Sequence, residues 1–230
     1  MSITFYDLAG AEENRRFSPF CWRTKMALAH KGLAFETIPW RFTDKPVIAP
    51  FGSERVPVIV DNGRSVNDSW TIVNYLEDTY RDRPSLFGGN GGRAATRFIN
   101  AWADNVLAPA IFPLVVLDIF KHIAPADRDY FRTSREQRVG TKLENVCGDP
   151  EPHLLAVRKV FEPLRQTLAT QAFIGGDTAL YPDYIVFGTL QWARAISPLR
   201  LLDPSDPVDA WRQRLLDSFD GLARSAPGYW

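Results

Sequence analysis

Ser18 and Pro19 stand at the start of a predicted helix that follows a strand and a loop. Free backbone N–H groups and the helix dipole at such a start stabilise negative charge. Acyl transfer by the Ser18 hydroxyl would need a base, and no histidine lies nearby in the sequence. Donating a hydrogen bond to a bound thiolate needs no base. The segment therefore indicates either an anion site or an ordinary helix cap, which serine before proline also forms.

Cys21 lies one turn into the same helix, where the helix dipole could activate its thiol. The third position of a helix in such a unit usually turns inward, so we expect Cys21 to pack in the core. Cys147 lies far along the chain, and His30, His122 and His153 are isolated from one another. These residues fit no metal-ligand spacing and no disulfide framework, so we expect no metal site and a reducing compartment.

Two further positions carry groups that could hold a small peptide. Val56 precedes Pro57 at the head of a predicted strand. This pair would suit a cis peptide bond that exposes backbone groups to the peptide edge of a ligand, and a trans bond in an edge strand is the alternative. Asp68 and Ser69 place a carboxylate and a hydroxyl at a helix start, which suits an ammonium and a carboxylate in one small volume, or a simple cap.

The elements that must position these groups alternate between strands and helices up to residue 82. A βαβ unit comes first, because residues 3–7 and 35–40 are β-prone and flank a helix that begins at Ser18 and ends at Lys31-Gly32. Crossover rules make its two strands parallel. The elements that follow are an irregular helix within 43–55, an antiparallel hairpin with strands at 56–60 and 65–66, and a helix at 70–80.

Residues 83–93 contain Pro84 and a cluster of glycines, a flexible composition that we take as a domain boundary. Every later pattern is helical, with helices predicted at 94–107 and on to 120, at 127–143, 153–170, 182–195 and 206–223. Strands first and helices afterwards is typical of an α+β fold class. The predicted organisation is a βαβ-α-ββα domain at 1–82, a linker at 83–93 and an all-helical domain at 94–230.

The composition argues against several classes of protein. The 27 Lys and Arg residues cancel the 27 Asp and Glu residues, so the strongly basic surface of a nucleic-acid-binding protein is missing. The first residues lack the basic start and long apolar stretch of a secretory signal, so we expect no export and a cytoplasmic protein. The most apolar tract, 106–120, falls short of the roughly 20 apolar residues that span a bilayer. We expect a buried helix there and no membrane contact.

In order and spacing, the motifs resemble those of the glutathione S-transferase superfamily. The motifs are Ser18-Pro19-Phe20-Cys21, Glu54-Arg55-Val56-Pro57 and Asp68-Ser69. The resemblance covers nearly the whole chain and implies a thioredoxin-like, glutathione-binding N-terminal domain followed by the all-helical domain of the superfamily. The first motif also echoes the glutaredoxin active site. Serine stands where the attacking cysteine of glutaredoxins would be, which counts against dithiol redox chemistry.

A narrower resemblance involves the segments 18–25, 53–57 and 130–138, which are similar to the bacterial lignin β-etherase branch and to related fungal transferases. The chain departs from the superfamily near Pro182, where a capping box normally places Ser or Thr three residues before Asp. Here Leu180 precedes Asp183. Asp183 can still accept from a backbone N–H, but the reciprocal hydroxyl bond is lost, which bears on folding more than on catalysis.

The resemblance implies a role for each motif in binding glutathione as a co-substrate. Ser18 would donate a hydrogen bond to the glutathione sulfur and lower the pKa of its thiol, so that more thiolate is present to attack an electrophile. The backbone N–H and C=O of Val56, ahead of a cis Pro57, would pair with the cysteinyl portion. Asp68 and Ser69 would hold the γ-glutamyl end.

Arg55 would bind the glycyl carboxylate of glutathione through its guanidinium, with Lys45 as a helper. The electrophile would be apolar and aromatic and would bind between the domains. Trp102, Phe112 and Leu114 are the candidate wall residues of that pocket, although each could equally pack in the core.

The expected function is thus that of a cytoplasmic glutathione transferase in detoxification, with cleavage of β-aryl ethers as one candidate reaction. A glutathione-dependent thiol reductase acting through Cys21 is a second interpretation, and it requires an accessible thiol with a low pKa. A non-catalytic binding protein for glutathione and an aromatic ligand is a third. The superfamily resemblance also implies a homodimer, although no sequence feature specifies its interface.

Overall fold

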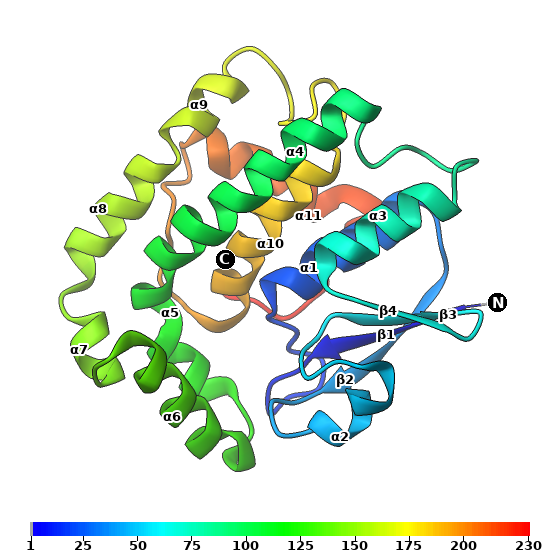
Figure 1. Cartoon of the computed structure of the whole chain (residues 1–230). Coiled ribbons are helices and arrows are strands. Elements are labelled where there is room, and N and C mark those ends of the chain that lie inside the picture. The colour runs from blue at the N-terminus through cyan, green and yellow to red at the C-terminus, as the bar shows by residue number, and fades with distance from the viewer. Residues whose placement is uncertain (1) are drawn as a thin grey trace.

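The computed structural model describes residues 2–230 and contains a mixed β-sheet with its helices beside a bundle of helices (Figure 1). The sheet order is β2-β1-β3-β4, with β1 and β2 parallel and the other neighbouring pairs antiparallel. The α+β fold class predicted from the sequence is confirmed. The strands are β1 (Ile3–Leu8), β2 (Phe35–Trp40), β3 (Val58–Asp61) and β4 (Arg64–Asn67).

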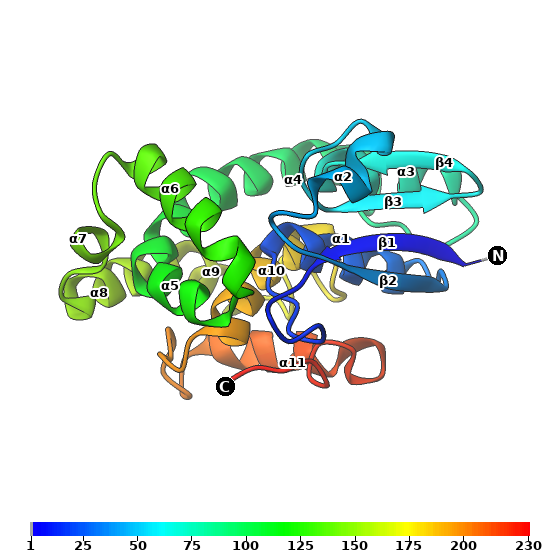
Figure 2. The same cartoon turned by 90° about the horizontal axis from the view of Figure 1, so that it is seen from below.

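Helices connect these strands in the predicted order. α1 and α3 lie between the sheet and the helical bundle, and Figure 2 shows the sheet and the outer helices of the bundle at opposite ends of the molecule. The irregular helix predicted within 43–55 is a short α-helix followed by a 3₁₀ turn. The elements are α1 (Pro19–His30), α2 (Lys45–Ile48), η1 (Ala49–Phe51) and α3 (Ser69–Thr79).

The start of α1 is fixed by its cap and by its packing against the bundle. Ser18 is the N-cap and Pro19 is the first helical residue, as the sequence predicts. The bundle helix α10 (Tyr181–Ile196) crosses this start at Gly188, where an added Cβ would lie 2.6 Å from the Pro19 carbonyl oxygen. A residue with a side chain would push the two helices apart, so glycine allows α10 to hold the beginning of α1 in place.

The rest of the chain is helical, but two predicted helices are each divided. The predicted helix at 127–143 ends at Val139 because Gly140 adopts a left-handed conformation with φ +72°, and the predicted helix at 153–170 is split at Phe161. The bundle also begins earlier than predicted, at Asn90 inside the expected linker. The remaining helices are α4 (Asn90–Trp102), α5 (Ala108–His122), α6 (Arg128–Val139), α7 (Leu143–Cys147), α8 (Pro150–Val160), α9 (Glu162–Leu168) and α11 (Pro207–Gly221).

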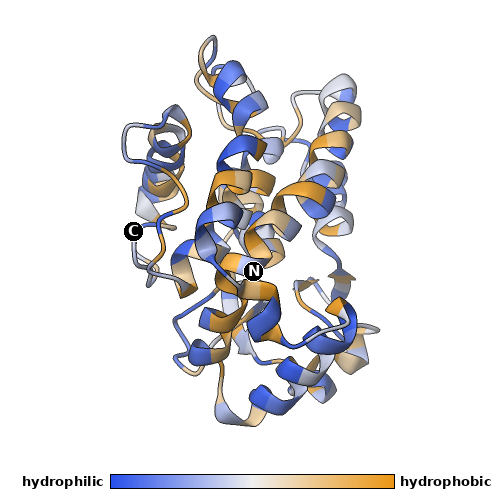
Figure 3. Cartoon of the chain, turned by 90° about the vertical axis from the view of Figure 1, so that its left-hand side faces the viewer, coloured by the Kyte–Doolittle hydropathy of each residue, from blue (hydrophilic) through white to orange (hydrophobic). Residues whose placement is uncertain are grey.

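A π-helical turn, η2 (Ala103–Leu107), joins α4 and α5 into one helix that runs from Asn90 to His122. On length and composition alone this helix could cross a membrane, as core helices of other proteins also could. Its second half buries Ile111 and Val115 completely, as predicted for the tract 106–120, whereas Val106 is 43% exposed. Figure 3 shows hydrophobic and hydrophilic residues on the same helices, the pattern of amphipathic packing.

The start of α10 shows how the chain compensates for its unusual cap. Asp183 accepts a hydrogen bond from the backbone N–H of Leu180 at 3.0 Å, as predicted. The same buried carboxylate also accepts from the N–H groups of Ile174 and Gly175 and from the indole of Trp211. These bonds join the preceding loop and α11 to the helix start, so Asp183 serves the packing of the bundle.

Candidate functional site

A groove of about 400 Å³ lies where α1, the loop before β3 and the start of α3 meet. Phe20 from α1 forms one wall, residues 52–57 form another, and Asn67 and Asp68 close the end. The structure therefore brings Arg55, Val56, Pro57 and Asp68 together beside the start of α1, although they lie in separate segments of the sequence. A groove of this size can take a small peptide-like ligand.

Ser18 lies beside this groove but does not line it. The residue is 4% exposed, and its Oγ accepts a hydrogen bond from the backbone N–H of Cys21 at 3.2 Å. A hydrogen bond between the Ser18 and Cys21 side chains partly offsets the raised pKa of the Cys21 thiol, so the Ser18 hydroxyl is shared with that thiol. Phe20, which lines both grooves, is 39% exposed. Ser18 is thus a helix cap, one of the two roles that the sequence left as alternatives.

Cys21 is completely buried and packs in the core, as expected. Burial and the nearby Asp7 carboxylate raise the pKa of its thiol well above the ordinary value. A thiol reductase acting through Cys21 needs an accessible thiol with a low pKa, and the structure shows neither. That interpretation is wrong, because the third position of α1 faces inward and buries the sulfur in the core.

The loop before β3 offers backbone groups to the groove. The Val56–Pro57 peptide bond is cis, as the sequence suggested. Within residues 2–230, neither the N–H nor the C=O of Val56 has a hydrogen-bond partner. Ser53 braces the loop, because its hydroxyl donates to the Arg55 carbonyl at 2.7 Å. The Arg55 side chain is exposed and lines the groove. Its guanidinium forms no ion pair with a carboxylate in residues 2–230.

Asp68 occupies the far end of the groove in an unusual backbone conformation, with φ +68°. Its Oδ1 accepts from the N–H of Thr71 at 2.9 Å and from the Thr71 hydroxyl at 3.1 Å, which caps α3. Positive φ is uncommon for a residue with a side chain and often marks a functional position. Ser69 is only 4% exposed, and its carbonyl accepts from the hydroxyl of Tyr181 in the bundle.

A second groove, of about 440 Å³, lies on the other side of Phe20 and Asp68. One wall is the start of α3, including Ser69, and the other is formed by Arg97, Asn100, Ala101, Asp104 and Asn105 from α4 and η2. Arg23 of α1 pairs with Asp104 at 2.8 Å and thereby joins this wall to the sheet side. The sequence reasoning missed these residues. The spacing of Arg97, Asn100, Ala101 and Asp104 was a usable signal, because residues three and four apart lie on one face of a helix.

The predicted pocket-wall residues lie outside these two grooves. Trp102, Phe112 and Leu114 line neither groove and pack, half-buried, against the core. The helix turns the face of Asn100 and Asp104 toward the groove, so Trp102 points in another direction because successive residues are about 100° apart.

Lys45 also lies outside both grooves. Its Nζ is 3.8 Å from a carboxylate oxygen of Glu54 and 5.0 Å from the centre of the Tyr130 ring. Glu54 does line the first groove, so Lys45 stands at its rim. In residues 2–230, no group of three or more His, Cys, Asp or Glu side chains is arranged to hold a metal ion.

Comparison with known proteins supports the resemblance to glutathione S-transferases in both the N-terminal and the C-terminal part of the chain. Residues 17–79 match the family model for the glutathione S-transferase N-terminal domain, and residues 94–202 match the model for the C-terminal domain. A probable glutathione S-transferase of Oryza sativa subsp. japonica, GSTU6, is 25% identical over 210 residues, which are 86% of this chain and 80% of that protein. Glutathione S-transferase U8 of Arabidopsis thaliana is 31% identical over 175 residues, which are 72% of this chain and 64% of that protein.

Solved structures have the same fold. Glutathione transferase GSTFuA3 from Phanerochaete chrysosporium superposes with a TM-score of 0.78 at 26% identity, covering 98% of this chain and 94% of that one. A glutathione S-transferase of Ceriporiopsis subvermispora, CsGST63524, crystallised in complex with glutathione, superposes with a TM-score of 0.81 at 24% identity and 99% coverage of both chains.

Proposed function

The chain belongs to the glutathione S-transferase superfamily, and we propose that it activates glutathione as a thiolate for attack on an aromatic electrophile. The observation that carries this proposal is the groove at the start of α1. It contains a carboxylate, a backbone segment without hydrogen-bond partners in residues 2–230 and a guanidinium without an ion pair there, and the Ser18 hydroxyl lies beside it. Glutathione carries a thiol, a peptide backbone, an ammonium group and a glycyl carboxylate, which are the chemical complements of these groups.

Each part of glutathione has a matching group in the groove. The Val56 N–H and C=O pair with the cysteinyl backbone in the manner of an added strand. The Asp68 carboxylate binds the ammonium of the γ-glutamyl end, and the neighbouring Ser69 belongs to the same helix start. The Arg55 guanidinium binds the glycyl carboxylate, and Lys45 contributes only from the rim. Glutathione bound in this way directs its sulfur toward the start of α1.

The hydrogen bond from Ser18 then favours the thiolate over the thiol. The glutathione thiol loses its proton to solvent, and the Ser18 hydroxyl donates to the sulfur anion. The backbone N–H of Cys21 already occupies a lone pair of Ser18 Oγ at 3.2 Å, so the hydroxyl is held in place. The thiolate sulfur forms a bond to an electrophilic carbon, and the leaving group departs with its electron pair.

Cleavage of β-aryl ethers is the reaction we propose to screen first. In that reaction the sulfur bonds to the carbon that carries the ether oxygen, the C–O bond breaks, and a phenolate leaves. The resemblance of segment 130–138 to the β-etherase branch supports this choice, as does the similarity to fungal transferases in fold. We further propose a cytoplasmic role in detoxification.

We also propose a homodimer, and the outer face of α4 supports it. Phe98 is 73% exposed there, and Val106 further along the helix is 43% exposed. Large apolar side chains in that position suit contact with a second copy of the chain. Sedimentation at several concentrations should show a dimer that Phe98→Glu weakens by about tenfold or more in dissociation constant. An unchanged dimer in this variant would place the interface elsewhere.

An ultraviolet difference titration with glutathione near neutral pH tests the proposed chemistry. We expect a saturable thiolate absorbance in the wild-type protein that disappears in Ser18→Ala, while glutathione still binds. Binding without a thiolate signal in the wild type would indicate a non-catalytic carrier of glutathione and an aromatic ligand. Absence of binding would overturn the proposal as a whole.

A further inference from the structure

Helix α6 carries arginines of two kinds. Arg132 is neutralised, because its guanidinium lies 2.9 Å from carboxylate oxygens of both Glu136 and Glu144. Arg135 and Arg138, one turn further along, form no ion pair with any carboxylate in residues 2–230. A cation that is held in place without a counter-ion is a candidate for binding an anionic ligand.

The Arg135 guanidinium is fixed by aromatic stacking. Its Cζ lies 5.0 Å from the centre of the Phe42 ring and 4.7 Å from that of Phe131. One nitrogen, Nη1, donates to the hydroxyl of Ser134 at 2.8 Å. Phe42 follows β2 and also packs against Phe17, so this stack joins the sheet side to the bundle. A guanidinium that is held on two rings loses little freedom when its remaining N–H groups bind a ligand.

Two neighbouring arginines place positive charge around Arg135, and Tyr130 opposes their effect on its pKa. Burial lowers the pKa of Arg135 from its ordinary value, and the positive charges of Arg138 and Arg55 lower it further. Arg55 lines the first groove, so the positive charge of α6 extends to the edge of the proposed glutathione site. Glu54 also lines that groove, but it is 81% exposed and lies 3.8 Å from Lys45.

Aromatic rings lie beside both arginines of this face. Tyr130 is 37% exposed and packs 6.3 Å from Phe42, between ring centres. The Arg138 guanidinium lies 5.0 Å above the ring of Phe112. Flat apolar surfaces next to cations suit a ligand that is itself aromatic and carries an acid group.

Glutathione brings one glycyl carboxylate to this region, and Arg55 is matched to it under the proposed function. We propose that Arg135, assisted by Arg138, binds a carboxylate of the second substrate, so that the enzyme acts preferentially on aromatic acids. This assignment rests on the proposed function for the identity of the reaction. The carboxylate site itself rests on the stacked and unpaired guanidinium.

A matched pair of electrophiles tests this assignment. A chlorodinitrobenzoate and the corresponding chlorodinitrobenzamide differ in charge but present the same reaction, in which the glutathione sulfur bonds to the aryl carbon and chloride leaves. After correction for the uncatalysed rates, kcat/KM should favour the acid in the wild type. Arg135→Gln should lower the acid-to-amide ratio by about tenfold or more, because a charge-assisted hydrogen bond is lost.

Control variants distinguish a loss of selectivity for the acid from a general loss of structure or activity. Arg135→Lys keeps the charge and should restore part of the ratio. Lys159→Gln removes one positive charge from an exposed side chain on α8 and should leave the ratio unchanged. If Arg135→Gln fails to fold, the exposed Arg138→Gln carries the test and should lower the ratio by a smaller factor.

Three results would overturn or redirect the assignment. An unchanged ratio in folded Arg135→Gln and Arg138→Gln would overturn it. A higher KM for glutathione with both electrophiles and an unchanged ratio would assign Arg135 to the glycyl carboxylate instead. If the wild type turns over neither electrophile, the proposed function fails, and binding of the two probes by tryptophan fluorescence decides the carboxylate site. Preferential binding of the acid that Arg135→Gln abolishes would support that site independently.

Discussion

The two ends of α3 use a carboxylate in opposite ways. Asp68 at the start is exposed, adopts φ +68° and faces two grooves, with only one oxygen engaged by the helix. Glu77 near the end has both oxygens engaged within the protein. A carboxylate with free capacity can bind a ligand, whereas one whose bonds are all internal stabilises the fold.

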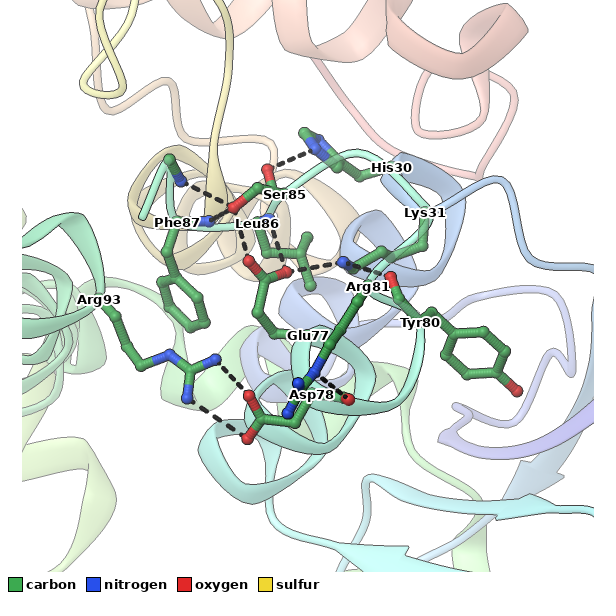
Figure 4. Close-up of polar contacts among 11 residues, drawn as sticks. His30, Lys31, Glu77, Asp78, Tyr80, Arg81, Ser85, Leu86, Phe87 and Arg93 are labelled. Carbon is green, nitrogen blue, oxygen red and sulfur yellow. Dashed lines mark hydrogen bonds and ion pairs between the residues drawn. The ribbon is translucent and has the colours of Figure 1, made fainter. Parts of the chain in front are cut away.

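Figure 4 shows the network around Glu77. One oxygen accepts from the N–H of Leu86 at 2.9 Å and lies 2.7 Å from the Lys31 ammonium, and the other accepts from the hydroxyl of Ser85. Lys31 is 1% exposed and donates also to the Tyr80 carbonyl at 3.1 Å. The network joins the ends of α1 and α3 to segment 83–93, whose composition suggested flexibility. Those bonds hold the first part of that segment in place.

The largest effect should follow removal of the Glu77 carboxylate. Glu77→Ala leaves the buried Lys31 ammonium without its partner, and breaking a buried pair costs about 3 to 5 kcal/mol. Chemical denaturation followed by circular dichroism measures this loss in the free energy of unfolding. Asp82→Ala is the matched control, because Asp82 is 80% exposed and its removal should change stability by less than about 0.5 kcal/mol. Equal losses in the two variants would mean that the network adds nothing to stability.

The dependence of stability on acidic pH tests the same role of Glu77. Burial of Glu77 opposes ionisation, but the bonds from Leu86, Lys31 and Ser85 outweigh it and hold the pKa of Glu77 below its ordinary value. A depressed carboxyl pKa gives stability that is fully present above the unfolded-state pKa and is lost as the pH falls through the folded-state pKa. The wild type should therefore lose stability in that acidic range more steeply than Glu77→Gln. Parallel curves of stability against pH for the two proteins would mean that ionised Glu77 does not stabilise the fold.

Ser18→Ala should give the next largest effect, on activity. Loss of a hydrogen bond to the developing or bound anion should lower kcat by about a hundredfold, while the KM for glutathione changes by less than about threefold. The variant also loses a helix cap worth about 1 kcal/mol. Asp149→Ala removes a comparable cap from α8, where Asp149 accepts from the N–H of Glu151 at 3.1 Å. That control should lose similar stability and no activity. Equal losses in turnover and glutathione affinity for Ser18→Ala would exclude its proposed role.

The sequence predicted well what local chemistry determines. The cap at Ser18 and the helix end near Gly32 follow from signals within a few residues of the helix, and the parallel pairing of β1 with β2 follows from the crossover rule. The division of the predicted helix at 127–143 depends on Gly140, because glycine in a helical pattern is tolerated in some contexts and ends the helix in others.

The far side of the site could not be predicted in the same way. Which face of α4 meets the groove depends on how the bundle packs on α1, so Asn100 and Asp104 were missed and Trp102, which lines neither groove, was named instead. Arg135 became a candidate ligand-binding residue for two reasons. It stacks on Phe42, more than 90 positions earlier in the chain, and it forms no ion pair with a carboxylate in residues 2–230. Such contacts are properties of the assembled molecule.

The smallest effect distinguishes the two cations predicted to serve the glycyl carboxylate of glutathione. Arg55 lines the groove with no described ion pair, so Arg55→Gln should raise the KM for glutathione by about tenfold and leave kcat nearly unchanged. Lys45 is 40% exposed, lies 3.8 Å from Glu54 and stands outside the groove, so Lys45→Gln should raise that KM by less than about twofold. Steady-state kinetics at varied glutathione concentration measures both. A larger effect for Lys45→Gln than for Arg55→Gln would place the glycyl carboxylate at the rim and would leave the guanidinium groups of Arg55 and Arg135 as the cations available to the second substrate.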